Sequence, residues 1–192
     1  MNRRLYIIAG CNGAGKTTAS NMLIPFVFQN SRFLNADNIA RENWPDNPEN
    51  KAIEAGRIML SKIDAMIDEG LSMTIETTLA ARSYTKLIDK AHRNGYDVML
   101  VFFWLKSPEI ALQRVMQRVS EGGHNIPEDT ILRRYEKGIK NLFNLYIPLC
   151  DMWHIYDNSD HNRKPIAKGR KNELIQIIDE TIYNYLYEYA RQ

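Results

Sequence analysis

The clearest chemical signature of the chain lies near its amino terminus, where glycines and small residues lead into a lysine and a threonine. This segment matches the pattern G-x-x-x-x-G-K-[ST], whose backbone N–H groups surround phosphate oxygens. In that pattern Lys16 reaches the β and γ phosphates and the hydroxyl of Thr17 ligates Mg²⁺. We therefore expect ATP and Mg²⁺ as cofactors. The residues predicted to bind the nucleotide are Gly10, Cys11, Asn12, Gly13, Ala14, Gly15, Lys16, Thr17 and Thr18.

Two acidic residues follow short apolar runs that are typical of buried strands. Asp37 comes after the run 32–35, and Glu76 ends the run 73–76. Phosphoryl transfer to a hydroxyl needs a carboxylate that orients and deprotonates the acceptor, and Asp37 is placed for that role. Glu76, with Thr77 and Thr78 after it, is predicted to contact the substrate, or to hold a magnesium-bound water. The simpler alternatives are a turn or helix cap at Asp37 and a capping carboxylate at Glu76.

The strongest strand of the chain, residues 98–105, has no acidic residue at its carboxyl end. Switch GTPases and motor ATPases hold Mg²⁺ with an aspartate that ends such a strand. This pattern disfavours both classes and leaves a small kinase.

Four arginines occupy two consecutive predicted helices that a Gly122-Gly123 segment separates. Arg114 and Arg118 lie four residues apart on one helix, and Arg133 and Arg134 lie on the next. Such a pair of helices suits a lid over residues 114–140 that closes on ATP, with Arg118 and Arg133 as catalytic arginines that stabilise the transferred phosphoryl group. The alternative is a solvated surface on which these arginines pair with nearby carboxylates.

A second cluster of cations lies between positions 163 and 171, where five residues are Lys or Arg. Aromatic residues do not interleave with them, and Pro165-Ile166-Ala167 stand in the middle. We expect a solvated edge or a hairpin here rather than a nucleic-acid-binding patch.

The elements that position these residues alternate along the chain, with strands predicted at 5–9, 32–35, 73–76, 98–105 and 153–156. Helices are predicted at 16–28, 49–69, 83–94, 172–190 and in the two segments opened by Ser107-Pro108-Glu109 and Pro127-Glu128-Asp129. In 49–69 the expected apolar stripe starts at Ile53. This alternation predicts an α/β fold with a doubly wound sheet, whose ligands bind at the carboxyl ends of the strands.

Composition narrows the class of protein. The chain has 192 residues, of which 44% are hydrophobic and 25% charged, which is typical of globular domains. We expect one domain, residues 1–192. Cys11 and Cys150 have no metal-ligand or disulfide-framework spacing, and no stretch approaches a membrane helix, so we expect a cytosolic (cytoplasmic) protein. The net charge of +2 gives no support to nucleic-acid binding.

Five motifs in order make the chain resemble the zeta-toxin-like branch of P-loop kinases. They are AGCNGAGKTT, NADNIA, TIETTLA, FFWLKSPEIALQRVMQRVSEGGHNIPEDTILRRY and YDNS. The resemblance implies a kinase-type five-stranded parallel sheet of order 2-3-1-4-5 with a helical lid. It also implies transfer of the γ-phosphate of ATP to a UDP-activated N-acetyl amino sugar, and an antitoxin that shields the ATP site. By the same resemblance Asp37 is the base, Glu76 contacts substrate, and Arg118 and Arg133 are the lid arginines.

The sequence thus predicts an ATP- and Mg²⁺-dependent kinase that acts on a hydroxyl of a small molecule. Two alternatives stay open. One is an ATP-binding regulatory module without a competent acceptor site, which would not need Asp37 and Glu76. The other is a 5'-hydroxyl nucleic-acid kinase that uses the basic run 163–171, whose binding would depend steeply on salt.

Overall fold

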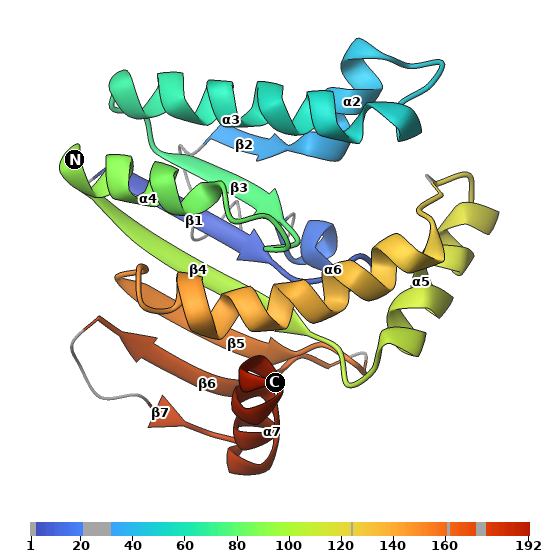
Figure 1. Cartoon of the computed structure of the whole chain (residues 1–192), viewed down its shortest axis with the longest axis vertical. Coiled ribbons are helices and arrows are strands. Elements are labelled where there is room, and N and C mark those ends of the chain that lie inside the picture. Colours follow the sequence, from blue (N-terminus) through green and yellow to red (C-terminus); the bar gives the residue numbers. More distant parts are fainter. Residues whose placement is uncertain (1–2, 21–31, 124, 161, 172–175) are drawn as a thin grey trace.

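The computed structural model describes residues 3–20, 32–123, 125–160, 162–171 and 176–192, and it is built on one mixed sheet (Figure 1). Five strands are parallel and stand in the order β2-β3-β1-β4-β5, which confirms the predicted order. Their bounds are Arg3–Ala9 (β1), Arg32–Asn35 (β2), Met73–Thr77 (β3), Tyr96–Trp104 (β4) and Met152–Asp157 (β5). The carboxyl ends of these strands therefore meet at one edge, as the sequence predicted.

The sheet continues beyond the five predicted strands. Strand β6 (Lys164–Arg170) pairs antiparallel with β5, and β7 (Gln176–Ile177) pairs antiparallel with β6, so the sheet has seven strands. The basic run forms the hairpin that its composition suggested. A strand was hard to foresee there because three of its seven residues are cationic and only Ile166 and Ala167 enter the core.

The described helices connect the strands of the sheet. In Figure 1, α3, α4, α6 and α7 lie in front of it. The bounds are Ala36–Asn43 (α2), Ala52–Asp68 (α3), Tyr84–Arg93 (α4), Pro108–Ser120 (α5), Glu128–Asn141 (α6) and Glu180–Arg191 (α7). A short 3₁₀ turn (Glu49–Lys51) precedes α3, and a π-helical turn (Leu142–Tyr146) extends α6. None of the described helices is long and apolar enough to cross a membrane.

Two helix predictions need correction. The last helix does not begin at Asn172: residues 176–177 are in β7, and α7 starts at Glu180 after Asp179, whose side chain accepts a hydrogen bond from the Ile182 N–H. Residues 172–175 lie outside the described part. Ile53 is 71% exposed, so the buried stripe of α3 starts at Ala55 instead. The first helix is seen at residues 16–20, and the rest of its predicted span lies outside the described residues.

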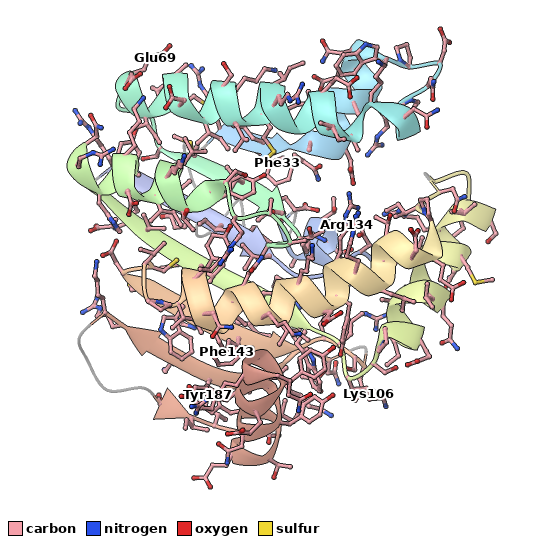
Figure 2. All side chains as sticks on the ribbon, viewed as in Figure 1. Phe33, Glu69, Lys106, Arg134, Phe143 and Tyr187 are labelled. Carbon is pink, nitrogen blue, oxygen red and sulfur yellow. The ribbon has the colours of Figure 1, made fainter. Side chains whose placement is uncertain are left out.

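The core fills the space between the sheet and these helices. Ile7, Leu100 and Ile155 from three neighbouring strands are fully or nearly fully buried. The stripe predicted for α6, Ile131, Tyr135, Ile139 and Leu142, is buried against them. At the carboxyl end of the chain, the rings of Phe143 and Tyr187 meet edge to face where α7 packs on the turn after α6 (Figure 2). This packing fixes the edge at which the five parallel strands end.

Candidate active site

The phosphate-binding loop lies directly after β1, and its glycines are required by the fold. Gly10 has φ +143°, and a Cβ there would stand 2.4 Å from the carbonyl oxygen of Phe103 on β4. Gly15 has φ +78°, and a Cβ there would meet the side-chain amide of Asn158 at 2.5 Å. A helix begins at Lys16, so the loop presents a helix N-terminus to the space above it.

This loop forms one wall of a cleft with a volume of about 600 Å³. Asn12, Gly13 and residues 15–19 line it, and across from them stand side chains from β2, α2, β3 and α5 and from the turn after β5. Lys16 is buried and its Nζ donates to the carbonyl oxygen of Cys11 at 2.9 Å. The lysine is therefore held over the loop.

Glu76 lies beside this loop because β3 is the direct neighbour of β1. The hydroxyl of Thr17 donates to its two carboxylate oxygens, at 3.0 Å and 3.2 Å. Glu76 thus stands at the end of a strand beside β1, as the predicted strand order 2-3-1-4-5 requires. This position suits the predicted role of holding a magnesium-bound water, and it supplies the acid that residues 98–105 lack.

The surroundings of Glu76 disfavour its charged form. Burial raises the pKa of its carboxyl group, and the nearby carboxylate of Asp37 adds to the rise. Lys16, the Thr17 hydroxyl and the Asn35 side chain act in the opposite direction without cancelling it. A cation next to this carboxyl group stabilises its charged form.

Thr17 and Glu76 are suitable groups for the Mg²⁺ that a P-loop kinase uses. Oxygen ligands are the ones that Mg²⁺ prefers, and it keeps several waters and phosphate oxygens in its coordination shell. Among the residues that the structure describes, no three acidic, imidazole or thiol groups gather to form a complete protein site. The residues present therefore fit a Mg²⁺ ion held jointly with the nucleotide phosphates.

Asp37 lies in the first turn of α2, on the opposite wall of the cleft. The helix cap is Asn35, whose side-chain oxygen accepts from the Asp37 N–H at 2.7 Å, so the carboxylate of Asp37 is not used for capping. Asp37 thereby faces the same space as Glu76 and Lys16. One turn later, Arg41 also lines the cleft.

Arg41 was not predicted as a site residue, although its spacing from Asp37 was a usable signal. Residues four apart share one face of a helix, so a helix at 36–43 would have placed both at the cleft. Asn38, Asp160 and Arg163 also line the cleft and were not predicted as site residues. The latter two come from the turn after β5, whose position depends on the hairpin to β6.

Arg114 on α5 connects the phosphate-binding loop to the turn after β5. Its guanidinium donates to the carbonyl oxygens of Asn158 at 2.9 Å, Ser159 at 2.8 Å and Gly13 at 3.3 Å. The Asn158 side chain completes this connection by donating to the carbonyl oxygen of Ala14 at 2.7 Å. These contacts hold the loop in position.

The remaining predicted arginines differ in their placement. Arg118, in the last turn of α5, lines the cleft. Arg133 is exposed and is absent from the residues that line the cleft, whereas Arg134 lies half-buried on α6 and donates to the side-chain oxygen of Asn12 at 3.1 Å (Figure 2). Burial lowers the pKa of Arg134, and the Asp37 carboxylate opposes this effect. The helix period brings the second of the two adjacent arginines to the loop.

Thr77 and Thr78 follow Glu76 but are not among the residues that line the cleft. The Thr77 hydroxyl accepts from the Leu79 N–H at 3.2 Å, and the Thr78 carbonyl oxygen lies against Gly138 of α6. Both threonines shape the loop after β3 in this structure. Their predicted contact with substrate stays a prediction.

Cys11 is buried inside the loop, and burial raises the pKa of its thiol to about 11. A thiol that stays protonated at neutral pH is a poor nucleophile. Its place in the site is therefore structural, as part of the phosphate-binding loop.

With this geometry in view, comparisons with known proteins decide the family. The zeta toxin family model matches residues 2–163. This chain belongs to the zeta toxin family. An uncharacterized protein of Haemophilus influenzae is 31% identical over 135 residues, which are 70% of this chain and 94% of that protein.

Solved structures show the same fold at low sequence identity. A structure from the PezAT chromosomal toxin-antitoxin system of Streptococcus pneumoniae matches with a TM-score of 0.68 and 16% identity, over 99% of this chain and 86% of that one. A structure of the AvrRxo1-ORF1:AvrRxo1-ORF2 complex with ATP matches with a TM-score of 0.74 and 14% identity, over 96% of this chain and 63% of the other. The fold is that of P-loop kinases, and this zeta toxin family member has a nucleotide-binding site.

Proposed function

We propose that this protein is a kinase that transfers the γ-phosphate of ATP to a hydroxyl group of a UDP-activated N-acetyl amino sugar. The observation that carries the proposal is the meeting of Lys16, Asp37 and Glu76 at one cleft. A module that only binds nucleotide does not need the Asp37 carboxylate. Because Asn35 caps the helix, that carboxylate is available for another role. Membership of the zeta toxin family supports the sugar-nucleotide acceptor.

The two walls of the cleft have different roles: one binds the phosphates and the other positions the acceptor hydroxyl. The P-loop N–H groups and Lys16 hold the β and γ phosphates. Mg²⁺, when bound beside Thr17 and Glu76, supplies charge neutralisation at the phosphate oxygens. Asp37 orients the acceptor hydroxyl and takes its proton as the bond to the γ-phosphorus forms and the bond to the ADP oxygen breaks.

Cations on a third side of the cleft stabilise the charge that develops on the transferred group. Arg118 lines the cleft, and Arg134 reaches its edge through Asn12. Preorganised donors of this kind stabilise developing charge more strongly than water does. We assign the stabilisation of this charge to Arg118 and Arg134, with Arg114 holding the loop in position.

The test is ³¹P NMR of the protein with ATP and Mg²⁺, with and without UDP-N-acetylglucosamine. We expect a new sugar-phosphate signal with the wild type and none with Asp37→Asn. Asp46→Asn, at an exposed position outside the cleft, is the matched control and should keep the signal. ATP that binds but is not consumed with this acceptor would contradict the proposed substrate and favour the regulatory module.

A protein partner is a second part of the proposal. The PezAT structure comes from a toxin-antitoxin system, and the resemblance implies an antitoxin that shields the ATP site. We propose that a partner of this kind covers the cleft mouth between α2 and α5. Competition between ATP and a co-expressed partner, measured by calorimetry, tests this; independent binding of the two would contradict it.

A further inference from the structure

The hairpin of β5 and β6 carries an unusual density of cations away from the catalytic residues. Five of the nine residues at positions 163–171 are Lys or Arg, and none is Asp or Glu. Along the sequence this run lacks the aromatic residues on which nucleic-acid bases stack. The neighbouring strand supplies them.

The register of the hairpin places rings beside cations. His154 of β5 is opposite Lys168 of β6, and Met152 is opposite Arg170. Residues directly opposite each other in an antiparallel pair point to the same face of the sheet. His154 and Tyr156 of β5 therefore share one face with Lys168 and Arg170 of β6.

Burial shows which face this is. Trp153 and Ile155 are buried, at 3% and 0% exposure, toward the side on which α6 and α7 pack (Figure 1). The residues that alternate with them, His154 and Tyr156, point to the opposite side and are half-buried. Lys168 beside them is exposed. In Figure 1, α3, α4, α6 and α7 lie on the other side of the sheet from these residues.

The rings on this face form a continuous ladder. Phe103 and Tyr156 stack with centroids 5.9 Å apart, and Tyr156 and His154 are nearly parallel, at 8°, with centroids 6.2 Å apart. The Arg163 guanidinium lies over the Phe103 ring at 5.9 Å. Burial and Lys168 both lower the pKa of His154, which keeps its ring neutral at physiological pH.

The stacked rings and the cations beside them lie between the nucleotide cleft and a second groove. Arg163 also lines the nucleotide cleft. At the other end of β6, a groove of about 630 Å³ is lined by Arg4, Tyr6, Arg170 and Lys171. One acid in that groove, Asp151, is already occupied by His92 and the Val98 N–H, and Asp97 stands opposite Arg4. A strip of rings and cations thus runs across this face of the sheet.

We infer that this strip, defined by His154, Tyr156, Lys168 and Arg170, binds single-stranded nucleic acid. Bases stack on the two rings and the phosphates lie beside the two cations. Charge alone would suit any polyanion, including an acidic peptide, but the parallel rings favour flat aromatic bases. The inference does not rest on the proposed kinase function, because the strip lies behind the sheet and not at Asp37.

The test is fluorescence anisotropy of a labelled 12-mer of uridine, titrated with the full chain at several KCl concentrations. Each phosphate contact on a single strand contributes about −0.7 to the slope of log K against log salt. Lys168→Ala with Arg170→Ala should therefore make the slope shallower by about 1.4. Arg57→Ala with Lys62→Ala, two exposed cations of α3, is the matched control and should bind as the wild type does.

Substitution of the ring separates stacking from charge. Tyr156→Leu should weaken binding by about fivefold or more, and Tyr156→Phe, which keeps the ring, should restore it. Melting curves and ATP binding verify that the variants fold. Equal affinity for the uridine 12-mer in Tyr156→Leu and the wild type, or equal competition by a poly-glutamate 12-mer, would overturn the inference in favour of an acidic-peptide surface. Absence of binding by the wild type at about 50 mM KCl, where phosphate contacts are strongest, would overturn it entirely.

Discussion

The hydroxyl of Thr17 donates to both carboxylate oxygens of Glu76, across 59 positions of sequence. This contact joins the first turn of the helix after the phosphate-binding loop to the end of the strand beside β1. It places a hydroxyl and a carboxylate next to Lys16, where the β and γ phosphates of a nucleotide bind. The pair therefore links nucleotide binding, the metal and the acceptor side of the cleft.

Lys16 and Asp37 should separate binding from transfer. Lys16→Ala removes the cation that holds the phosphates, so we expect ATP affinity to fall by about tenfold or more. Asp37→Asn removes the base and should lower the transfer rate by about 10²- to 10⁴-fold while ATP still binds. Calorimetry measures the first effect and single-turnover ³²P transfer the second. Wild-type transfer by Asp37→Asn would refute the assignment of the base.

Glu76 should make stability depend on pH in a defined direction. Because burial raises its pKa in the folded protein above the ordinary value of 4.5, the folded state binds the proton more tightly, and this group lowers stability as pH rises through that window. Glu76→Gln removes the charge, so the variant should have a higher Tm than the wild type at pH 7.5. The difference should shrink toward zero as the pH falls well below the ordinary value of 4.5, where both states hold the proton.

Melting curves in the absence of nucleotide and Mg²⁺ test this point. Glu42→Gln, an exposed glutamate of α2, is the control and should show no such dependence. A Glu76→Gln variant that melts below the wild type at pH 7.5 would show that the hydrogen bonds to the carboxylate outweigh its desolvation.

Arg134 and Arg133 form a matched pair of adjacent residues. Arg134 reaches Asn12 of the loop, whereas Arg133 faces solvent. Arg134→Ala should lower the transfer rate by about 10²-fold or more, since it removes a donor near the developing charge. Arg133→Ala should change it by less than about twofold. The reverse order of these two effects would restore the assignment made from sequence.

Asn158 should support the loop rather than the reaction itself. Asn158→Ala deletes its bond to the Ala14 carbonyl, and the KM for ATP should rise about fivefold with little change in kcat, because one buried hydrogen bond is worth about 1 kcal/mol. Asn94→Ala is the control: it deletes a similar bond, from the amide to the Lys90 carbonyl, far from the cleft. If both variants change KM alike, the effect is one of global stability.

Much of this fold was predictable because buried parallel strands leave apolar runs, such as residues 98–105, and because caps such as Gly95 mark helix ends. The phosphate-binding loop was predictable because its chemistry is local. The sequence does not show which side chains become neighbours in the folded protein. It does not show that Arg134 rather than Arg133 faces Asn12, or that His154 stands opposite Lys168. Each of these depends on tertiary packing that no short window of residues encodes.

Helix α6 is anchored at several points along its length. Arg134 bonds Asn12, the Tyr135 hydroxyl donates to the Leu105 carbonyl at 2.7 Å, and Asn141 donates to the Leu79 carbonyl at 2.6 Å. A helix held in this way cannot swing as a whole without breaking buried bonds. Closure of the predicted lid on a bound nucleotide then depends on movement of the end of α5 relative to a fixed α6, so that Arg118 approaches the phosphates while Arg134 keeps its place beside Asn12.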